Sequence, residues 1–311
     1  MLRTYLQYKP AWLQLLVFFG IAFGVFFVIN AFALPLLQYY FKLSTSDIIA
    51  FGNGKLEHPA AKQFLMASQA IQVLSLFVLP AYLYSYFASP TPSSWLGVQQ
   101  PPAGKYTLAV VALVIVGIPA TGLLGILNQK IPLPASLIQD ELVTNKAIEK
   151  IALATNITDL MVSIVVIGLL AAIGEELFFR AVLQRICIQW TGKPWAGIIL
   201  TAALFSAFHF QFSGFLPRMG LGIILGAVYW YTGSLWCSIL FHFLHNTIGV
   251  LVGYNNPAML NDNALVKDSL WLTIIVGTVA MGIVLCIILW LKKHSTVTYN
   301  KVYPAEPSFF E

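Results

Sequence analysis

Residues 158–189 read TDLMVSIVVIGLLAAIGEELFFRAVLQRICIQ. A helix needs ~20 predominantly apolar residues to cross the hydrocarbon core of a bilayer, and this segment reaches that length without a proline. Two adjacent carboxylates, Glu175 and Glu176, lie inside it. Because an ionisable side chain in hydrocarbon costs ~2.5–3.5 kcal/mol on the insertion scale, each of them demands an explanation. The segment therefore indicates a membrane-spanning helix that carries function.

The composition places the whole chain in the same class. Of its 311 residues, 59% are hydrophobic and 9% are charged, against ~25% charged residues in an ordinary soluble domain. A chain this poor in charge cannot cover a globular surface with solvated groups, so lipid must be its solvent. The net charge of +5 is small, and the basic residues lie mainly at the ends of apolar segments. This pattern is typical of membrane anchors, so we expect the lipid bilayer as a partner and no nucleic acid.

Eight apolar segments are candidates for membrane spans. Their approximate bounds are 12–40, 64–87, 106–127, 158–189, 195–212, 214–231, 234–252 and 270–291. Between the third and the fourth, residues 130–156 place charges among apolar residues, with the spacing of an amphipathic helix at the membrane surface. We therefore predict an all-α, polytopic transmembrane bundle of about eight spans plus one amphipathic surface helix. Residues 1–311 would form a single membrane domain.

The distribution of lysine and arginine predicts the orientation. Basic residues are most concentrated near the two ends of the chain, where Lys292 and Lys293 directly follow the last predicted span. The positive-inside rule then favours an orientation with both termini in the cytoplasm.

The polar residues that are expensive in lipid gather on three predicted spans. The fourth span carries Glu175, Glu176 and Arg180, the fifth carries His209, and the seventh carries His242 and Asn246. Glu176 and Arg180 are four residues apart, so on a helix they face one another and can neutralise each other. Glu175 points about 100° away and is left without that partner. The remaining groups could converge on one polar pocket within the bundle.

Such a pocket would have the parts for hydrolysis. A carboxylate can take a proton from water, and a neighbouring imidazole can share or orient that proton. Imidazole and amide N–H groups can stabilise an oxyanion. Alternatively, one glutamate and two histidines are a known zinc set, which here would be Glu175, His209 and His242.

Three short motifs resemble a known family. Glu175 to Arg180 fits EExxxR, Phe205 to His209 fits FxxxH, and His242 to Asn246 fits HxxxN. In this order, on successive spans, they resemble the CPBP family of CAAX-processing and bacteriocin-processing intramembrane proteases. This family is also called the Abi family and includes the type II CAAX prenyl endopeptidases. The resemblance covers a catalytic core of about residues 153–252, preceded by accessory spans over about 12–127 that match nothing.

The resemblance implies roles for these residues. Glu175 and His209 would activate water, His242 and Asn246 would stabilise the oxyanion, and Glu176 and Arg180 would be supporting residues. The family's glutamate-protease members imply that no cofactor is required, with Zn²⁺ as the alternative. The protein would be an intramembrane endopeptidase, belonging to a bacterial inner (plasma) membrane. Its partner would be a peptide or protein substrate at the membrane.

Two other functions remain open at this point. A proton or cation transporter would need polar residues along the full membrane depth, and the first, third and eighth spans offer few. A non-catalytic immunity or scaffold protein could lose motif residues, whereas all of them are present. The protease interpretation makes a geometric prediction. Glu175, His209, His242 and Asn246 should converge and line a cavity that opens to water or lipid, with Arg180 outside this cluster.

Overall fold

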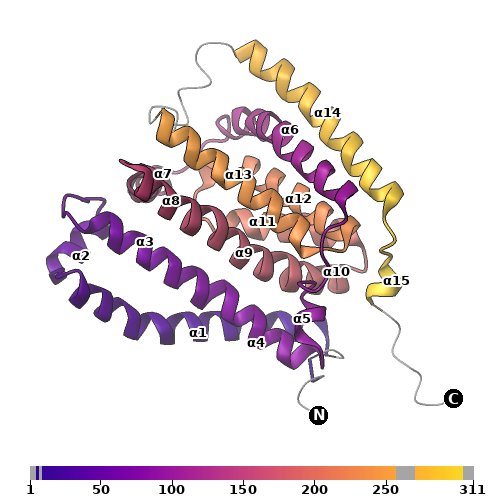
Figure 1. Cartoon of the computed structure of the whole chain (residues 1–311), viewed down its shortest axis with the longest axis horizontal. Coiled ribbons are helices and arrows are strands. Elements are labelled where there is room, and N and C mark those ends of the chain that lie inside the picture. The colour runs from indigo at the N-terminus through magenta and orange to yellow at the C-terminus, as the bar shows by residue number, and fades with distance from the viewer. Residues whose placement is uncertain (1–4, 7–8, 257–269, 304–311) are drawn as a thin grey trace.

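The computed structural model describes residues 5–6, 9–256 and 270–303, and every regular element within them is a helix (Figure 1). Seven of the helices, counted over these residues, are long and apolar enough to cross a membrane. They are α1 (Ala11–Tyr40), Ala61–Ala88, α6 (Gly104–Asn128), Ile157–Thr191, Phe212–Thr232, α13 (Leu235–Asn255) and α14 (Leu270–His294). The prediction of a polytopic helical membrane bundle is confirmed.

Two of these spans are compound helices. The second is built from α3 (Ala61–Gln72), the π-helical η2 (Val73–Val78) and α4 (Leu79–Ala88). The fourth is built from α8 (Ile157–Ser163), η3 (Ile164–Leu170), α9 (Ala171–Glu176), η4 (Leu177–Gln184) and α10 (Arg185–Thr191). Here η3 and η4 are again π-helical. Glu175 and Glu176 therefore end a short α-helical stretch between two wider turns, a feature that is frequent at functional sites.

The fifth predicted span differs from the expectation. It is the shorter helix α11 (Pro194–Ala207), 14 residues long, and so ~21 Å at 1.5 Å per residue. After it, Phe210 adopts a left-handed φ of 52°. This conformation ends helices, usually at a glycine. The chain turns here into η5 (Phe212–Gly214) and α12 (Phe215–Thr232), and His209 lies in the turn and not on a helix.

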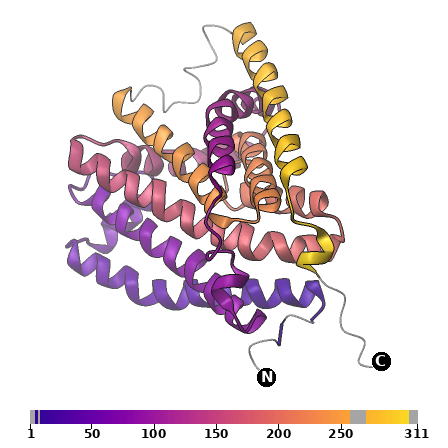
Figure 2. The same cartoon turned by 45° about the vertical axis from the view of Figure 1, so that its right-hand side comes forward.

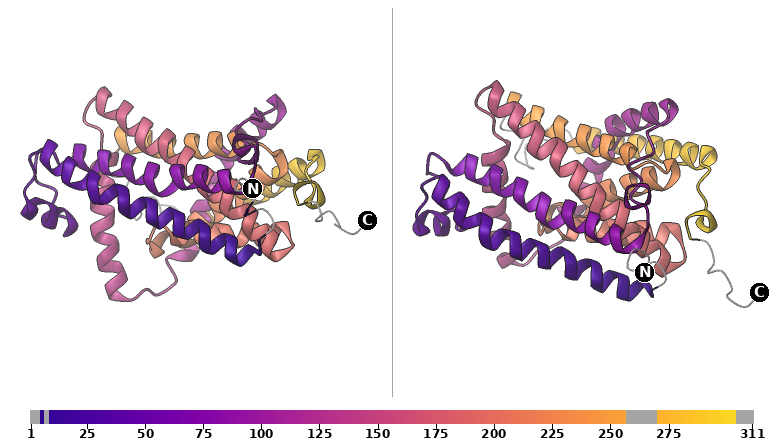
Figure 3. Two further views of the ribbon diagram at one scale, coloured as in Figure 1. Left: turned by 90° about the horizontal axis from the view of Figure 1, so that it is seen from below. Right: turned by 60° about the horizontal axis from the view of Figure 1, so that its bottom comes forward.

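The predicted amphipathic helix is α7 (Ala135–Ala152). It projects away from the long helices at one end of the bundle (Figure 3, left). It is not only a surface element, because Glu141 on its inner side is 4% exposed. The remaining short helices are α2 (Thr45–Gly52), α5 (Pro92–Trp95) and α15 (Tyr299–Val302).

The spans pack around the fourth one. α1 packs on α4 and on η2 at one side of the molecule, while α6 packs against α14 at the other (Figures 1 and 2). Between them, α13 packs along η3 and α9. Two buried apolar clusters result, one on each side of this central pair. The EExxxR segment thus lies at the centre of the bundle, where its charges are shielded from lipid.

A close helix approach fixes the position of this segment. A Cβ added to Gly174 would lie 2.4 Å from Cγ1 of Val73 on η2, so only glycine leaves room at this point. The second and fourth spans therefore touch directly beside Glu175.

Candidate active site

Glu176 is the most completely bound carboxylate of the motif. Its side chain is fully buried, and the Nε of Arg180 donates a hydrogen bond of 3.1 Å to its Oε2. The contact predicted from the i, i+4 spacing is thus present. On its other oxygen, Oε1, it accepts a 2.9 Å hydrogen bond from Nδ1 of His242 on α13. Both oxygens are engaged, so Glu176 holds the fourth and the seventh predicted spans together.

Glu175 has a different environment although it is the next residue. Its Oε2 is buried and has no hydrogen-bond partner among the described residues. This atom lies 3.8 Å from Nε2 of His242. That separation is too long for a direct hydrogen bond, but it allows both atoms to contact one water molecule. His242 therefore lies between two carboxylates, fixed by Glu176 on one side and facing Glu175 on the other.

The tautomer of His209 follows from its hydrogen bond. Its Nδ1 lies 2.8 Å from the carbonyl oxygen of Phe205. Because a carbonyl can only accept, Nδ1 must carry the hydrogen, and in the neutral ring Nε2 then has the free lone pair. Nε2 of His209 is therefore the ring atom that can accept a proton.

The ring of Phe205 connects the parts of this cluster. Its centroid lies 5.0 Å from that of His209 and 6.0 Å from that of His242. The guanidinium carbon of Arg180 lies 4.9 Å from the same centroid, within the range of a cation–π interaction. The prediction that Arg180 lies outside the cluster is therefore wrong. Its i, i+4 partner Glu176 is itself in the cluster, and the fully buried guanidinium packs against the face of the Phe205 ring there.

Asn246 makes an interhelical contact. Its Nδ2 donates a 3.0 Å hydrogen bond to the carbonyl oxygen of Ile167, in the π-helical stretch η3. An asparagine amide has two N–H donors, so this bond leaves a second one for another acceptor. Asn246 therefore lies one turn after His242 on α13 and tethers this helix to the fourth span.

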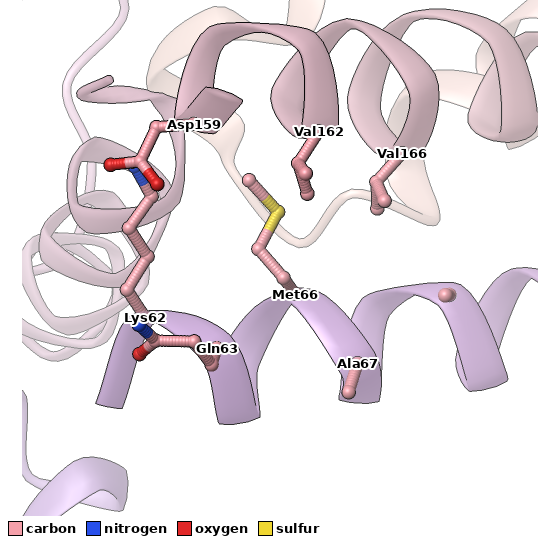
Figure 4. A pocket seen from close by; sticks show the side chains of 8 residues that line it. Lys62, Gln63, Met66, Ala67, Asp159, Val162 and Val166 are labelled. Atoms are coloured by element: carbon pink, nitrogen blue, oxygen red, sulfur yellow. The ribbon is translucent and has the colours of Figure 1, made fainter. Parts of the chain in front are cut away.

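The apolar groove shown in Figure 4 lies elsewhere. It has a volume of about 320 Å³ and runs between α3 and the start of the fourth span. Lys62 and Asp159 form an ion pair of 3.1 Å at one end of it, and Met66 and Val162 face its middle (Figure 4). None of the six polar residues of the three motifs lines it, namely Glu175, Glu176, Arg180, His209, His242 and Asn246. The expected cavity is therefore not this groove.

The zinc alternative does not fit the side chains present. Within the described ranges, no three His, Cys, Asp or Glu side chains are grouped so that they could hold a metal ion. We derive no step through a metal.

A comparison with protein families gives an independent finding. The model of the type II CAAX prenyl endopeptidase Rce1-like family matches residues 157–248. This part of the chain is Rce1-like. The matched Rce1-like segment begins at α8, ends within α13 and contains all six motif residues. The resemblance to CAAX-processing proteases is confirmed over residues 157–248, and this match points to a membrane protease of the CAAX type.

The chain is also similar to an uncharacterized 24.3 kDa protein of Escherichia coli. The two are 25% identical over 261 residues, which cover 81% of this chain and 100% of that protein. No solved structure matches this chain.

Three polar side chains outside the motifs hold the turn that carries His209. They are Asn128 at the end of α6, Glu141 on α7 and Arg218 on α12. Sequence reasoning missed these three residues, because each has the charge or polarity expected of a residue near the membrane surface. Their role depends on where α11 ends, and that end is marked by no glycine or proline.

Proposed function

We propose that this chain is an intramembrane endopeptidase that hydrolyses a peptide bond with a water molecule activated by Glu175. One observation carries the proposal. Oε2 of Glu175 is buried without a hydrogen-bond partner in the described structure, and it lies 3.8 Å from Nε2 of His242. A buried carboxylate oxygen left unpaired next to an imidazole is costly unless it serves function. The Rce1-like match supports a protease of the CAAX type.

The proposed reaction needs no group that the chain lacks. Glu175 takes a proton from water, and the resulting hydroxide adds to the carbonyl carbon of the substrate. The tetrahedral intermediate then collapses with cleavage of the C–N bond, and the proton held by the site passes to the leaving amine. Nε2 of His209 is the second acceptor for a proton during these steps.

The oxyanion would be stabilised from α13. The candidate donors are Nε2 of His242, in the state where the ring carries a proton on both nitrogens, and the second N–H of Asn246. Both side chains are fixed by their other contacts. Nδ1 of His242 is held by Glu176 and the first Asn246 N–H by Ile167. Donors that are fixed before the reaction stabilise developing charge most effectively.

The substrate would be a peptide or protein segment at the membrane. We infer a bacterial inner membrane, and the distribution of basic residues favours an orientation with both termini in the cytoplasm. The N-terminal end of α1 and the C-terminal end of α14 lie at the same end of the bundle (Figure 1), which supports an even number of crossings.

The experiment compares cells that produce the wild-type chain, Glu175→Gln or Glu149→Gln. Glutamine keeps the shape of the side chain and removes the base, whereas Glu149 is an exposed carboxylate on α7. We expect peptides released by the wild type and by Glu149→Gln to be absent with Glu175→Gln, as measured by mass spectrometry of the cellular peptides. The purified full-length proteins should reproduce the difference on one such peptide. Equal cleavage by a well-folded Glu175→Gln protein would refute the mechanism.

A further inference from the structure

Glu141 is a buried carboxylate that the hydrolytic mechanism does not use. It lies on α7, outside the Rce1-like segment, and is 4% exposed. Its Oε1 accepts hydrogen bonds from the backbone N–H groups of Phe212 and Ser213, the latter at 3.1 Å. A buried carboxylate is tolerated when it is hydrogen-bonded, and here both donors belong to one short backbone segment.

The segment that Glu141 binds is the end of the His209 turn. Phe212 is the third residue after His209, and the left-handed Phe210 lies between them. Asn145, one helical turn after Glu141 on α7, accepts a hydrogen bond from the side chain of Gln211. Helix α7 therefore contacts the turn through two side chains on the same face.

The remaining contacts of the turn make it rigid at both ends. Asn128 donates to the carbonyl oxygens of Phe212 and Ser213, at 2.9 and 2.8 Å, and accepts from the N–H of Leu216 at 2.7 Å. The hydroxyl of Ser206, before the turn, donates to the carbonyl oxygen of Phe215, after it, at 2.7 Å. The loop is thus closed on itself by Ser206 and fixed to the rest of the bundle by Asn128 and Glu141.

We propose that Glu141 is a positioning residue for His209: by binding the amides of Phe212 and Ser213, it fixes the turn that carries the His209 imidazole. This inference rests on the proposed peptidase function. The left-handed Phe210 needs such an anchor, because a bulky residue in this conformation is strained and persists only when its surroundings enforce it. Without the carboxylate, two backbone N–H groups lose their acceptor and the turn can relax toward a longer α11.

The test uses the full-length protein with three substitutions. Glu141→Ala removes both acceptor oxygens, Glu141→Gln keeps one, and Asp140→Ala removes the neighbouring, exposed carboxylate of α7. Displacement of a catalytic group by about 1 Å costs about 100-fold in rate. We therefore expect Glu141→Ala to lower kcat by about 100-fold with little change in KM. Glu141→Gln should recover most of this loss, and Asp140→Ala should match the wild type.

A second readout does not depend on peptidase activity. Hydrogen–deuterium exchange at the amides of residues 212 and 213 should become faster in Glu141→Ala and stay unchanged in Asp140→Ala. The rate at which diethyl pyrocarbonate modifies His209, measured relative to His58 in the same molecule, should change in parallel. If the wild type cleaves no peptide, the proposed function fails, and these two rates still decide whether Glu141 fixes His209.

Two results would overturn the inference. Unchanged exchange and unchanged His209 modification in a folded Glu141→Ala protein would mean that the carboxylate does not hold the turn. A lower unfolding temperature with wild-type kcat in the folded fraction would mean that Glu141 only stabilises the start of the helix after the turn. In contrast, recovery of kcat by Glu141→Gln together with slow exchange would establish the positioning role.

Discussion

Arg180 balances a charge that no water can reach. Its guanidinium and the carboxylate of Glu176 are both fully buried, and its two terminal nitrogens have no hydrogen-bond partner in the described structure. Removing one partner of a buried pair leaves an uncompensated charge, at a cost of ~3–5 kcal/mol. We expect Arg180→Ala to lower the free energy of unfolding by this amount, as measured by thermal unfolding of the purified protein in detergent. The double variant Glu176→Gln/Arg180→Met should recover part of the loss. A fully stable Arg180→Ala protein would contradict this account.

The ion pair between Lys62 and Asp159 should behave differently. Its side chains are 15% and 30% exposed, and pairs that reach solvent contribute ~0–1 kcal/mol. In Asp159→Asn the amide oxygen can still accept the hydrogen bonds from Thr155 and Lys62. We therefore expect a loss of less than ~1 kcal/mol in the same unfolding measurement. A loss as large as that of Arg180→Ala would mean that the pair is shielded from water.

The grouping of the ionisable side chains gives a prediction about metals. Since no three His, Cys, Asp or Glu side chains among the described residues are placed to hold a metal ion, we expect exhaustive chelation to leave peptide cleavage largely unchanged. The control is re-addition of Zn²⁺ after dialysis. Activity that disappears on chelation and returns with Zn²⁺ would favour the zinc alternative.

The spacing of the motifs predicted part of this geometry. Glu176 and Arg180 meet because a helix brings residues four apart onto one face, a relation that is visible in the sequence. Which glutamate holds His242 was not visible. The regular turn angle of an α-helix separates Glu175 from Glu176, whereas in the structure His242 contacts both, at 3.8 and 2.9 Å. That contact depends on how α13 packs against α9 and on the π-helical turns around it.

At the scale of the helices, the contact between the second and fourth spans beside Glu175 can be tested by changing the volume of the side chains that meet there. A methyl group at Gly174 would overlap Cγ1 of Val73, and overpacking of this kind costs ~1–3 kcal/mol. We expect Gly174→Ala to lower both the unfolding temperature and the rate of cleavage, since the displaced segment carries the base. Val73→Ala removes the overlapping atom, so the double variant Gly174→Ala/Val73→Ala should recover both. Additive losses in the double variant would show that this contact is not the cause.

The bounds of the long helices could be predicted from the sequence, whereas the end of the short helix α11 could not, and the difference has a physical reason. Long apolar segments identify spans without reference to their neighbours, so α1, α6 and α14 lie close to their expected bounds. The end of α11 could not be predicted, because its left-handed residue is Phe210 and not a glycine. The burial of Glu141 could not be predicted for a related reason. Glu141 is buried because it binds this turn, and the sequence of α7 alone does not show where the turn lies.

At the scale of the molecule, the site joins segments that are distant in the chain. Glu176 and His242 are 66 residues apart, and they meet because the fourth span and α13 pack side by side between the two apolar clusters. The position of Asn246 follows from the same packing, since its amide bonds Ile167 on the fourth span. Any change that separates these two helices should therefore affect Glu176, His242 and Asn246 together.

The arrangement of the spans predicts the orientation of the whole chain. If α11 crosses the membrane together with the seven longer helices, the chain crosses eight times. The N-terminal end of α1 and the C-terminal end of α14 then lie on the same side of the membrane, in agreement with their place at one end of the bundle in Figure 1. We expect a reporter that is active only in the cytoplasm to be active after residue 311 and after Gly192, and inactive in the α1–α2 connection. Activity in the α1–α2 connection and none at the other two positions would invert the assigned orientation.

The anchored turn also bears on how the chain is assembled. Helix α11 is too short to insert alone as an ordinary span, and its exit is stabilised by Glu141 and Asn128, which precede their partners by 71 to 88 residues. During synthesis the N-terminal part of a chain emerges first, so both acceptor and donor groups reach the membrane before the turn does. Helices α11 and α12 are thus synthesised after Asn128 and Glu141 have reached the membrane, and the position of His209 is set late in the assembly of the chain.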